Sequence, residues 1–272
     1  MGFVRSDAEV ERIRETMKTN RYDGARSLSI RYRTRPDVVE HVLPPGLTPT
    51  DEPLAEMSVF EIADSNCVGP FTGGALYVSA RYENRIGKYC LTMPMSTDAA
   101  IVWGRELFGE PKKGAACSLT RDGDTCSGHV DRYGDRIAQL DATLTDEQPV
   151  DEATETVFHY KHTPSVDGDG FHAMPTLVAI EMTNEIERFE TGDGAVSLRS
   201  TECDPLGEIA VETVLGAGYA EADLTTRQEP LTTVDPESFA PYAYGAGRMD
   251  DPAAVADHES PSGTREHGAK PS

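Results

Sequence analysis

A long series of short segments that alternate apolar and polar residues constrains the fold of this chain most. Alternation with a period of two is typical of half-buried strands, and the glycine, aspartate and proline residues that bound most segments favour tight turns. Consecutive strands joined by short turns pair antiparallel. The sequence therefore predicts an α+β fold that is mainly antiparallel β. The expected strands are 28–33, 57–62, 75–82, 89–93, 115–120, 125–132, 137–144, 157–162, 177–188, 194–200 and 209–218.

Helical patterns lie at the start of the chain and between some of the strands. Ser6 and Glu9 have the spacing of a capping box, and apolar residues follow at helical intervals, so we expect residues 1–24 to form a helical extension. A second short helix is expected over 36–43. At the other end, the polar segment 247–272 is rich in proline, glycine, serine and aspartate, and we expect an acidic, disordered tail there. Residues 25–246 remain as the main domain.

The charge of the chain excludes several kinds of partner. Lysine and arginine number 25 and aspartate and glutamate 47, which gives a formal net charge of −22. Dispersed acidic residues, with arginine preferred over lysine, are typical of adaptation to high salt, so we expect a halophilic source. We find no basic face for nucleic acid or an anionic membrane. Without a long apolar run or a signal-peptide pattern, a cytoplasmic location is expected.

The adjacent residues Lys112 and Lys113 stand out because the chain contains only four other lysines. They follow a predicted helix over 99–107, which Gly109 and Pro111 should end, and we expect both lysines in the turn after it. Neighbouring cations and burial each lower the pKa of a lysine. More of the side chain is then the neutral amine, which is a usable nucleophile. The alternative is a solvated basic turn.

No other pattern indicates a metal or a cofactor. The two histidines His159 and His162 are three residues apart on a predicted strand, which places them on opposite faces and argues against a shared metal. The glycine-rich segment 69–74 lacks the lysine and helix start of a phosphate loop, and we expect a turn there. The five cysteines are widely spaced, form no Cys-x-x-Cys pair and are expected to be reduced.

The sequence Gly-Arg-Glu-Leu at 104–107, followed by Pro-Lys-Lys at 111–113, resembles the hallmark of acetoacetate decarboxylases and their relatives. Softer similarities cover residues 25–245. The resemblance implies an acetoacetate decarboxylase-like β-barrel or cone with a few peripheral helices, and a homo-oligomer. It also implies a Schiff base between Lys112 and a small keto acid, with Lys113 as the electrostatic neighbour that helps to keep Lys112 neutral. Decarboxylation of acetoacetate or a related β-keto acid is the default reaction.

The chain departs from the family where the substrate would be bound. The family's active-site arginine and two glutamates fall near Ala25, Ser58 and Gly73, so these charges do not match. Arg26 and Glu61 lie close to these positions and are candidate substrate-binding residues.

Glu110 is a third candidate, at a position where the family often has an aromatic or apolar residue. It could transfer a proton in aldol or dehydration chemistry, or it could be an ordinary surface acid. An aldolase or dehydratase that uses the same Schiff base, and a non-catalytic ligand-binding or scaffold protein, remain alternatives.

Overall fold

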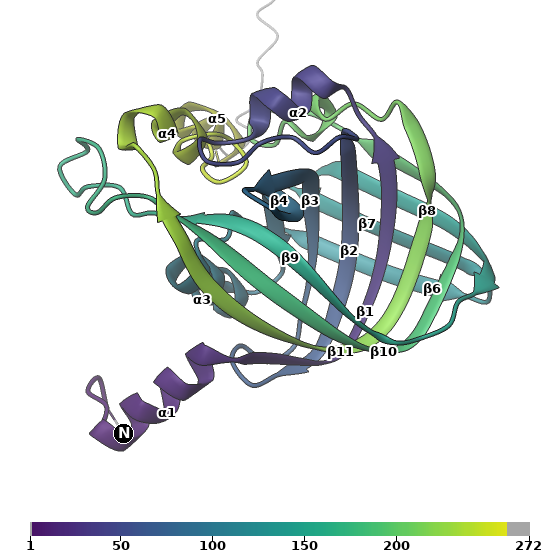
Figure 1. The fold of residues 1–272 in the computed structure, drawn as a ribbon, viewed down its shortest axis with the longest axis horizontal. Helices are drawn as coiled ribbons and strands as arrows, with labels where there is room; N and C mark the ends of the chain where they lie inside the picture. The colour runs from purple at the N-terminus through teal and green to yellow at the C-terminus, as the bar shows by residue number, and fades with distance from the viewer. Residues whose placement is uncertain (1, 260–272) are drawn as a thin grey trace, which may run out of the picture.

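Strands form most of the computed structural model, which describes residues 2–259 (Figure 1). The strands are β1 Asn20–Arg33, β2 Leu54–Ser65, β3 Phe71–Tyr82, β4 Arg85–Met95, β5 Lys112–Gly114, β6 Ala116–Asp122, β7 Thr125–Arg132, β8 Asp135–Glu147, β9 Glu152–Lys161, β10 Thr176–Leu198 and β11 Thr213–Thr233. The helices are α1 Asp7–Lys18, α2 Pro36–Val42, α3 Asp98–Phe108, α4 Pro236–Ala243 and α5 Pro252–Glu259, with a 3-10 turn at Leu206–Glu208.

Seven of these strands close into a barrel. They pair in the order β11, β1, β2, β3, β4, β9 and β10, and β10 then pairs with β11. The neighbours are antiparallel except β4 and β9, which form a short parallel pair. Beyond the ring, β8, β7 and β6 extend the sheet from the far half of β10. The predicted mainly antiparallel β-barrel with a few helices is confirmed.

The largest hydrophobic core lies outside the barrel wall. Side chains on the outer face of β1 and β2, such as Leu28 and Val59, pack against Val130 of β7 and Leu140 of β8. Because successive side chains of a strand point to opposite faces, the alternate residues of β1 and β2 face the barrel interior. The extra sheet therefore supplies the packed core, and the interior of the barrel is left to form a cavity.

The two longest strands differ from the sequence prediction. The segments 177–188 and 194–200 were expected as two strands, but both belong to β10, which continues through Gly192. A Cβ at Gly192 would lie 2.9 Å from the Cα of Leu144, so this glycine allows close strand approach and does not end the strand. The strand expected at 209–218 begins only at Thr213, because a 3-10 turn precedes it, and it runs on to Thr233.

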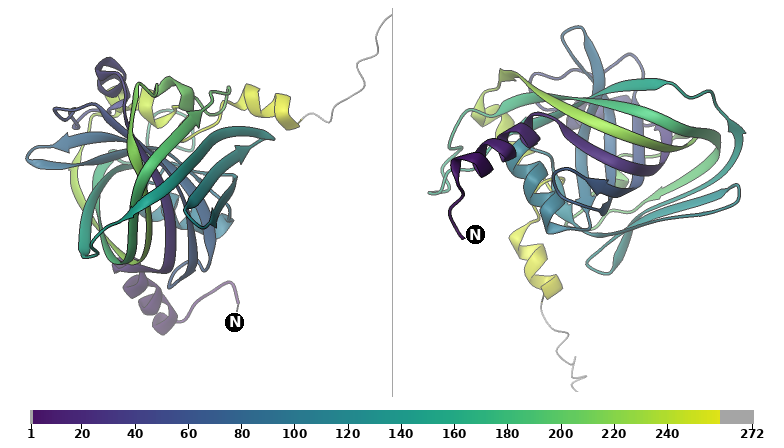
Figure 2. Two further views of the ribbon diagram at one scale, coloured as in Figure 1. Left: turned by 90° about the vertical axis from the view of Figure 1, so that its right-hand side faces the viewer. Right: turned by 90° about the horizontal axis from the view of Figure 1, so that it is seen from below.

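The predicted helices are present as α1, α2 and α3. Ser6 caps α1 and forms the expected capping box with Glu9. The helices α2, α4 and α5 lie near one end of the barrel and α1 projects from the other, and Figure 2 shows how far α1 and α5 extend (Figures 1 and 2). No helix within residues 2–259 is both long and apolar enough to span a membrane.

The boundaries of the predicted segments also shift. The expected helical extension over 1–24 includes the first residues of β1, which begins at Asn20. Disorder was expected from residue 247, but Arg248 and Asp250 make buried contacts, and α5 follows at Pro252–Glu259. Those contacts are with residues more than a hundred positions away, which a local pattern does not reveal. Residues 260–272 of the expected tail lie outside the described part of the chain.

Candidate active site

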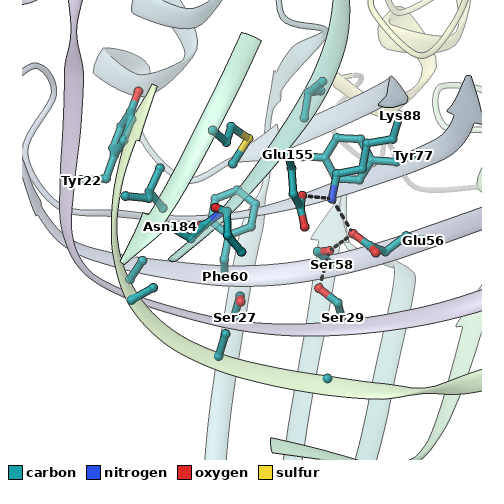
Figure 3. Close-up of a pocket in the computed structure, with 18 of the residues that line it drawn as sticks. Tyr22, Ser27, Ser29, Glu56, Ser58, Phe60, Tyr77, Lys88, Glu155 and Asn184 are labelled. Atoms are coloured by element: carbon teal, nitrogen blue, oxygen red, sulfur yellow. Dashed lines mark hydrogen bonds and ion pairs between the residues drawn. The ribbon is translucent and has the colours of Figure 1, made fainter. Parts of the chain in front are cut away.

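The barrel encloses a cavity of about 640 Å³, lined by side chains from β1, β2, β3, β4, β9, β10 and β11. On β1 the odd-numbered residues Ala25, Ser27 and Ser29 face it, as the two-residue period of a strand requires. Figure 3 shows Ser27 and Ser29 along one wall, with Tyr22 at one end of the view and Lys88 at the other. Lys112 and Glu110 also line this cavity.

Lys112 lies on strand β5 and is only 5% exposed. The strand pairs in parallel with β4, where Met93 is the partner of Lys112. The Lys112 Nζ lies 2.7 Å from Oε2 of Glu110 and 5.9 Å from the centroid of the Phe71 ring. The Glu110 contact is close but is not aligned as a hydrogen bond. The expected turn at Lys112 is therefore wrong, and a solvated basic turn is excluded for this residue.

Gly104 explains part of the sequence motif that precedes the lysines. It lies in α3, and a Cβ at this position would be 2.6 Å from both Cδ and Nζ of Lys112. The helix then ends at Gly109, whose φ of 77° is in the left-handed region that favours glycine. The chain turns back at this point, so that Glu110 and Lys112 cross the helix over Gly104. The missing side chain gives the lysine its place in the cavity.

Lys113 points away from the cavity, because neighbouring residues of a strand face opposite sides. Its Nζ lies 2.7 Å from Oδ1 of Asp204 and 2.6 Å from Oδ1 of Asp250. Arg132 binds the same two carboxylates, at 2.8 and 2.6 Å. Lys113 therefore belongs to a buried ion-pair network on the other face of β5. Its predicted role as the electrostatic neighbour of Lys112 stays a prediction, and the geometry argues against it because the charge of Lys113 is directed away from Lys112 and compensated by two carboxylates.

Two arginines hold the backbone around Lys112. Arg248 donates to the carbonyl oxygens of Gly109, at 2.6 Å, and Glu110, at 3.4 Å. Arg105 donates to the carbonyl oxygens of Lys112, at 3.1 Å, and Arg248, at 3.0 Å. Burial lowers the pKa of Arg248 to about 10, and the charge of Arg105 acts in the same direction. The segment after residue 246 thus clamps the loop that carries Glu110 and Lys112.

The candidates Arg26 and Glu61 do not line the cavity. They lie opposite each other on β1 and β2 and form an ion pair of 2.7 Å on the outer face of the wall. Ala25 and Ser58, where the charged residues of the similar family would fall, do line the cavity. The two candidates were displaced by one residue or more from these positions, and an odd shift reverses the strand face.

The same cavity contains a second charged cluster, which the sequence patterns did not predict. Lys88 Nζ lies 2.8 Å from Oε1 of Glu56 and 2.7 Å from Oε2 of Glu155 (Figure 3). Burial opposes the charge of Lys88, but the two carboxylates outweigh it and raise the pKa of Lys88. Ser58 donates to Glu56 at 3.4 Å and lies 2.8 Å from the Ser29 hydroxyl. The scarcity of lysine was a usable signal for Lys88, as it was for the pair.

His159 is a further polar residue of the cavity wall. It lies on β9, is 1% exposed, and its Nδ1 has no hydrogen-bond partner among the described residues. Burial lowers the pKa of His159 to about 4, so that the imidazole is neutral at neutral pH. The apolar residues Trp103, Leu107 and Phe108 of α3 are not among the residues that line the cavity. Leu107 and Phe108 pack on Val178 and Ile180.

Comparisons with known proteins agree with the motif and with the fold. A family model described as "Acetoacetate decarboxylase (ADC)" matches residues 10–234. An acetoacetate decarboxylase of Burkholderia cenocepacia is 31% identical over 206 residues, which cover 73% of this chain and 82% of that protein. One of Streptomyces nogalater is 28% identical over 211 residues, which cover 75% of this chain and 85% of that one.

Solved structures of low sequence identity share the fold. The acetoacetate decarboxylase of Legionella pneumophila is 24% identical with a TM-score of 0.72, and the match covers 79% of this chain and 87% of that one. The enduracididine biosynthesis enzyme MppR, complexed with the condensation product of pyruvate and imidazole 4-carboxaldehyde, is 20% identical with a TM-score of 0.65, covering 79% and 89%. From the family model, the relatives and the barrel together, the chain belongs to the acetoacetate decarboxylase family.

Proposed function

We propose that this protein is a Schiff-base-forming lyase in which Lys112 attacks the ketone of a keto acid. The observation that carries this is the position of Lys112, buried in the wall of a cavity with its Nζ directed to Glu110. Phe71, Met93 and Met95 form apolar wall beside it. A single buried amine in an apolar pocket is the minimum that imine chemistry requires.

Decarboxylation of a β-keto acid is the first candidate reaction. After Lys112 gives a proton to Glu110, its nitrogen bonds to the ketone carbon, and loss of water with return of that proton gives a protonated imine. The bond to the carboxylate then breaks, carbon dioxide leaves, and the bonding electrons move toward the imine nitrogen to form an enamine. A proton adds at carbon, and water hydrolyses the imine to release the ketone and the lysine. Glu110 serves as counter-ion once the imine nitrogen is charged, which stabilises the intermediate.

Aldol addition or dehydration on the same imine is the second candidate, and Glu110 favours it. A carboxylate next to the imine nitrogen can accept a proton from the neighbouring carbon and return it to a leaving hydroxyl. The absence of charged side chains at Ala25, Ser58 and Gly73 removes the groups expected for a decarboxylase. MppR offers a precedent within this fold, because the ligand named for that protein is a condensation product.

Borohydride trapping tests both candidates. Acetoacetate or pyruvate is added with borohydride in high salt, and the modified residue is identified by peptide mass analysis. We expect the ligand on Lys112, and none after Lys112→Ala. An unmodified lysine with several keto acids would contradict imine chemistry and favour the ligand-binding or scaffold alternative. After labelling is established, release of carbon dioxide from acetoacetate separates decarboxylation from aldol chemistry.

The setting of the reaction is also part of the proposal. A cytoplasmic homo-oligomer that acts on a small keto acid, without a cofactor and without a nucleic-acid or membrane partner, is what the family resemblance and the net charge of −22 support. Light scattering of the purified chain tests the oligomer, and a monomer at all concentrations would contradict it.

A further inference from the structure

The solvent exposure of the charged side chains that line the cavity differs between its two ends. At the Lys112 end, the side chains of Lys112 and Glu110 are 6% and 13% exposed. At the Lys88 end, the side chains of Lys88 and Glu56 are 21% and 14% exposed, and those of Glu155 and Arg31 are 47% and 61% exposed. The reactive amine therefore lies at the enclosed end, and the charged cluster lies toward the opening.

The two ends lie at different levels of β4. Lys88 and Met93, the strand partner of Lys112, are five positions apart on this strand, which is about 16 Å of backbone at the usual rise of a strand. The wall between them is largely apolar and includes Phe60, Val157 and Met182. With a volume of about 640 Å³, the cavity falls among those that hold ligands much larger than a four-carbon acid. Acetoacetate would fill only the enclosed end.

The charges of the lining compensate one another at both ends. Lys112 faces Glu110, and at the opening Arg31 and Lys88 face Glu56 and Glu155. Among the described lining residues, each cation thus has a carboxylate partner, and the cluster at the opening has two charges of each sign. A charged group on the far end of a substrate would find no counter-ion there. A hydroxyl group, by contrast, can donate to a carboxylate and accept from the ammonium without upsetting the balance.

Resting on the proposed function, we propose that the substrate is an extended keto acid whose chain beyond the ketone is apolar and ends in an uncharged polar group. Its carbonyl group reaches Lys112 at the enclosed end. Its apolar chain lies along the wall of β2, β9 and β10. A hydroxyl or similar group at the other end meets Lys88, Glu56 and Glu155 near the opening.

A series of methyl ketones tests the length and the polar end separately. Each forms an imine with Lys112 by loss of water, and borohydride then supplies a hydride that fixes the adduct. Butan-2-one, decan-2-one, 10-hydroxydecan-2-one and 9-oxodecanoate are compared by the concentration that gives half-maximal labelling of Lys112. Because burial of two methylene groups is worth roughly tenfold in affinity, we expect the ten-carbon ketones to label at concentrations more than tenfold below that of butan-2-one. The hydroxyl compound should label best and the carboxylate worst of the ten-carbon set.

Ser27 supplies a matched pair of variants. It lines the cavity between Ala25 and Ser29, and Phe60 is its partner on β2 (Figure 3). Ser27→Phe should weaken labelling by the long ketones at least tenfold relative to labelling by butan-2-one, while Ser27→Ala should keep the native ratio of the two. Labelling by butan-2-one also reports that the variant is folded.

The possible outcomes separate the two proposals. Equal labelling by butan-2-one and the long ketones, or preferred labelling by 9-oxodecanoate, overturns the extended substrate with an uncharged far end and leaves imine chemistry in place. Loss of all labelling by every ketone, with the native protein, overturns the proposed function and this inference together.

Discussion

Gly104 determines whether Lys112 can occupy its place, because Lys112 Nζ passes 2.6 Å from where a Cβ would be. Gly104→Ala should displace the lysine and reduce the rate of borohydride trapping at Lys112 by about a hundredfold, since misplacement by an ångström has costs of this order. Gly114→Ala is the control, because a Cβ there meets nothing nearer than 3.9 Å. Trapping at the same rate in both variants would refute the packing argument.

Lys113 is expected to stabilise the fold and not to tune the reaction. Lys113→Met leaves Asp204 and Asp250 with Arg132 as the remaining cation of the ion-pair network, and removing one member of such a network costs about 3 kcal/mol. Urea unfolding should show this loss, while the pH dependence of trapping at Lys112 stays the same. Lys18→Met, at an exposed helical position, should leave the urea midpoint unchanged. A shifted pH profile with unchanged stability would restore the electrostatic role of Lys113.

Strand β5 is held in place by three segments together: α3, the loop after it and the segment after residue 246. Arg248 provides the link through the Gly109 and Glu110 carbonyl oxygens. Arg248→Met should lower the trapping rate about tenfold, because charge-assisted hydrogen bonds of this kind are worth about 1.5–3 kcal/mol. Hydrogen exchange of residues 109–114 should rise in the same variant. The exposed Arg227→Met is the control, and equal exchange in the two variants would show that the link is not needed.

The elements themselves were largely predictable from the sequence. Alternation gave most strands of the barrel, and capping residues such as Ser6 gave the helix starts, because both signals are local. The break predicted in β10 near Gly192 was wrong, because the sequence does not distinguish a glycine that permits close strand approach from one that ends a strand. The segment after residue 246 was misjudged because its polar composition conceals long-range ion pairs.

The site was predictable only where its residues are adjacent in the sequence. Lys112 and Glu110 lie in one short motif, and the structure brings them together at 2.7 Å. Lys88, Glu56 and Glu155 come from three strands, so that only the barrel assembles them. The choice of Arg26 as a substrate-binding candidate missed the cavity-facing position 25 by one residue. On a strand, a shift of one residue moves the side chain from the cavity to the outer face.

For the whole molecule, the net charge of −22 predicts a strong dependence on salt. Raising the ionic strength from 0.1 to 1 M shortens the screening length from about 10 to about 3 Å, which weakens repulsion among dispersed carboxylates. We expect the melting temperature to rise over this range in potassium chloride. Calorimetry at several salt concentrations measures it, and a flat or falling melting temperature would contradict the expected halophilic adaptation.

The buried histidines predict how the stability of the molecule depends on pH. Burial lowers the pKa of His159 to about 4 and that of His162 to about 3, whereas a histidine of the unfolded chain has its usual pKa of 6.5. Between these values the unfolded state binds more protons than the folded state, so the free energy of unfolding must fall as the pH falls. Above about pH 6.5 this contribution is constant.

The amount of stability lost at low pH follows from the difference between the pKa of a histidine in the folded and in the unfolded chain. For His159, a difference of this size corresponds to about 3 kcal/mol lost as the pH falls from about 6.5 to about 4. Urea unfolding at intervals between pH 4 and 8 measures the slope, and His159→Asn should reduce it by close to one proton in this range. Carboxylates such as Asp250, whose pKa Lys113 and Arg132 lower to about 2 against the opposing effect of burial, act mainly below this window. Equal stability at pH 5 and pH 7 would show that the histidines are not buried as neutral groups.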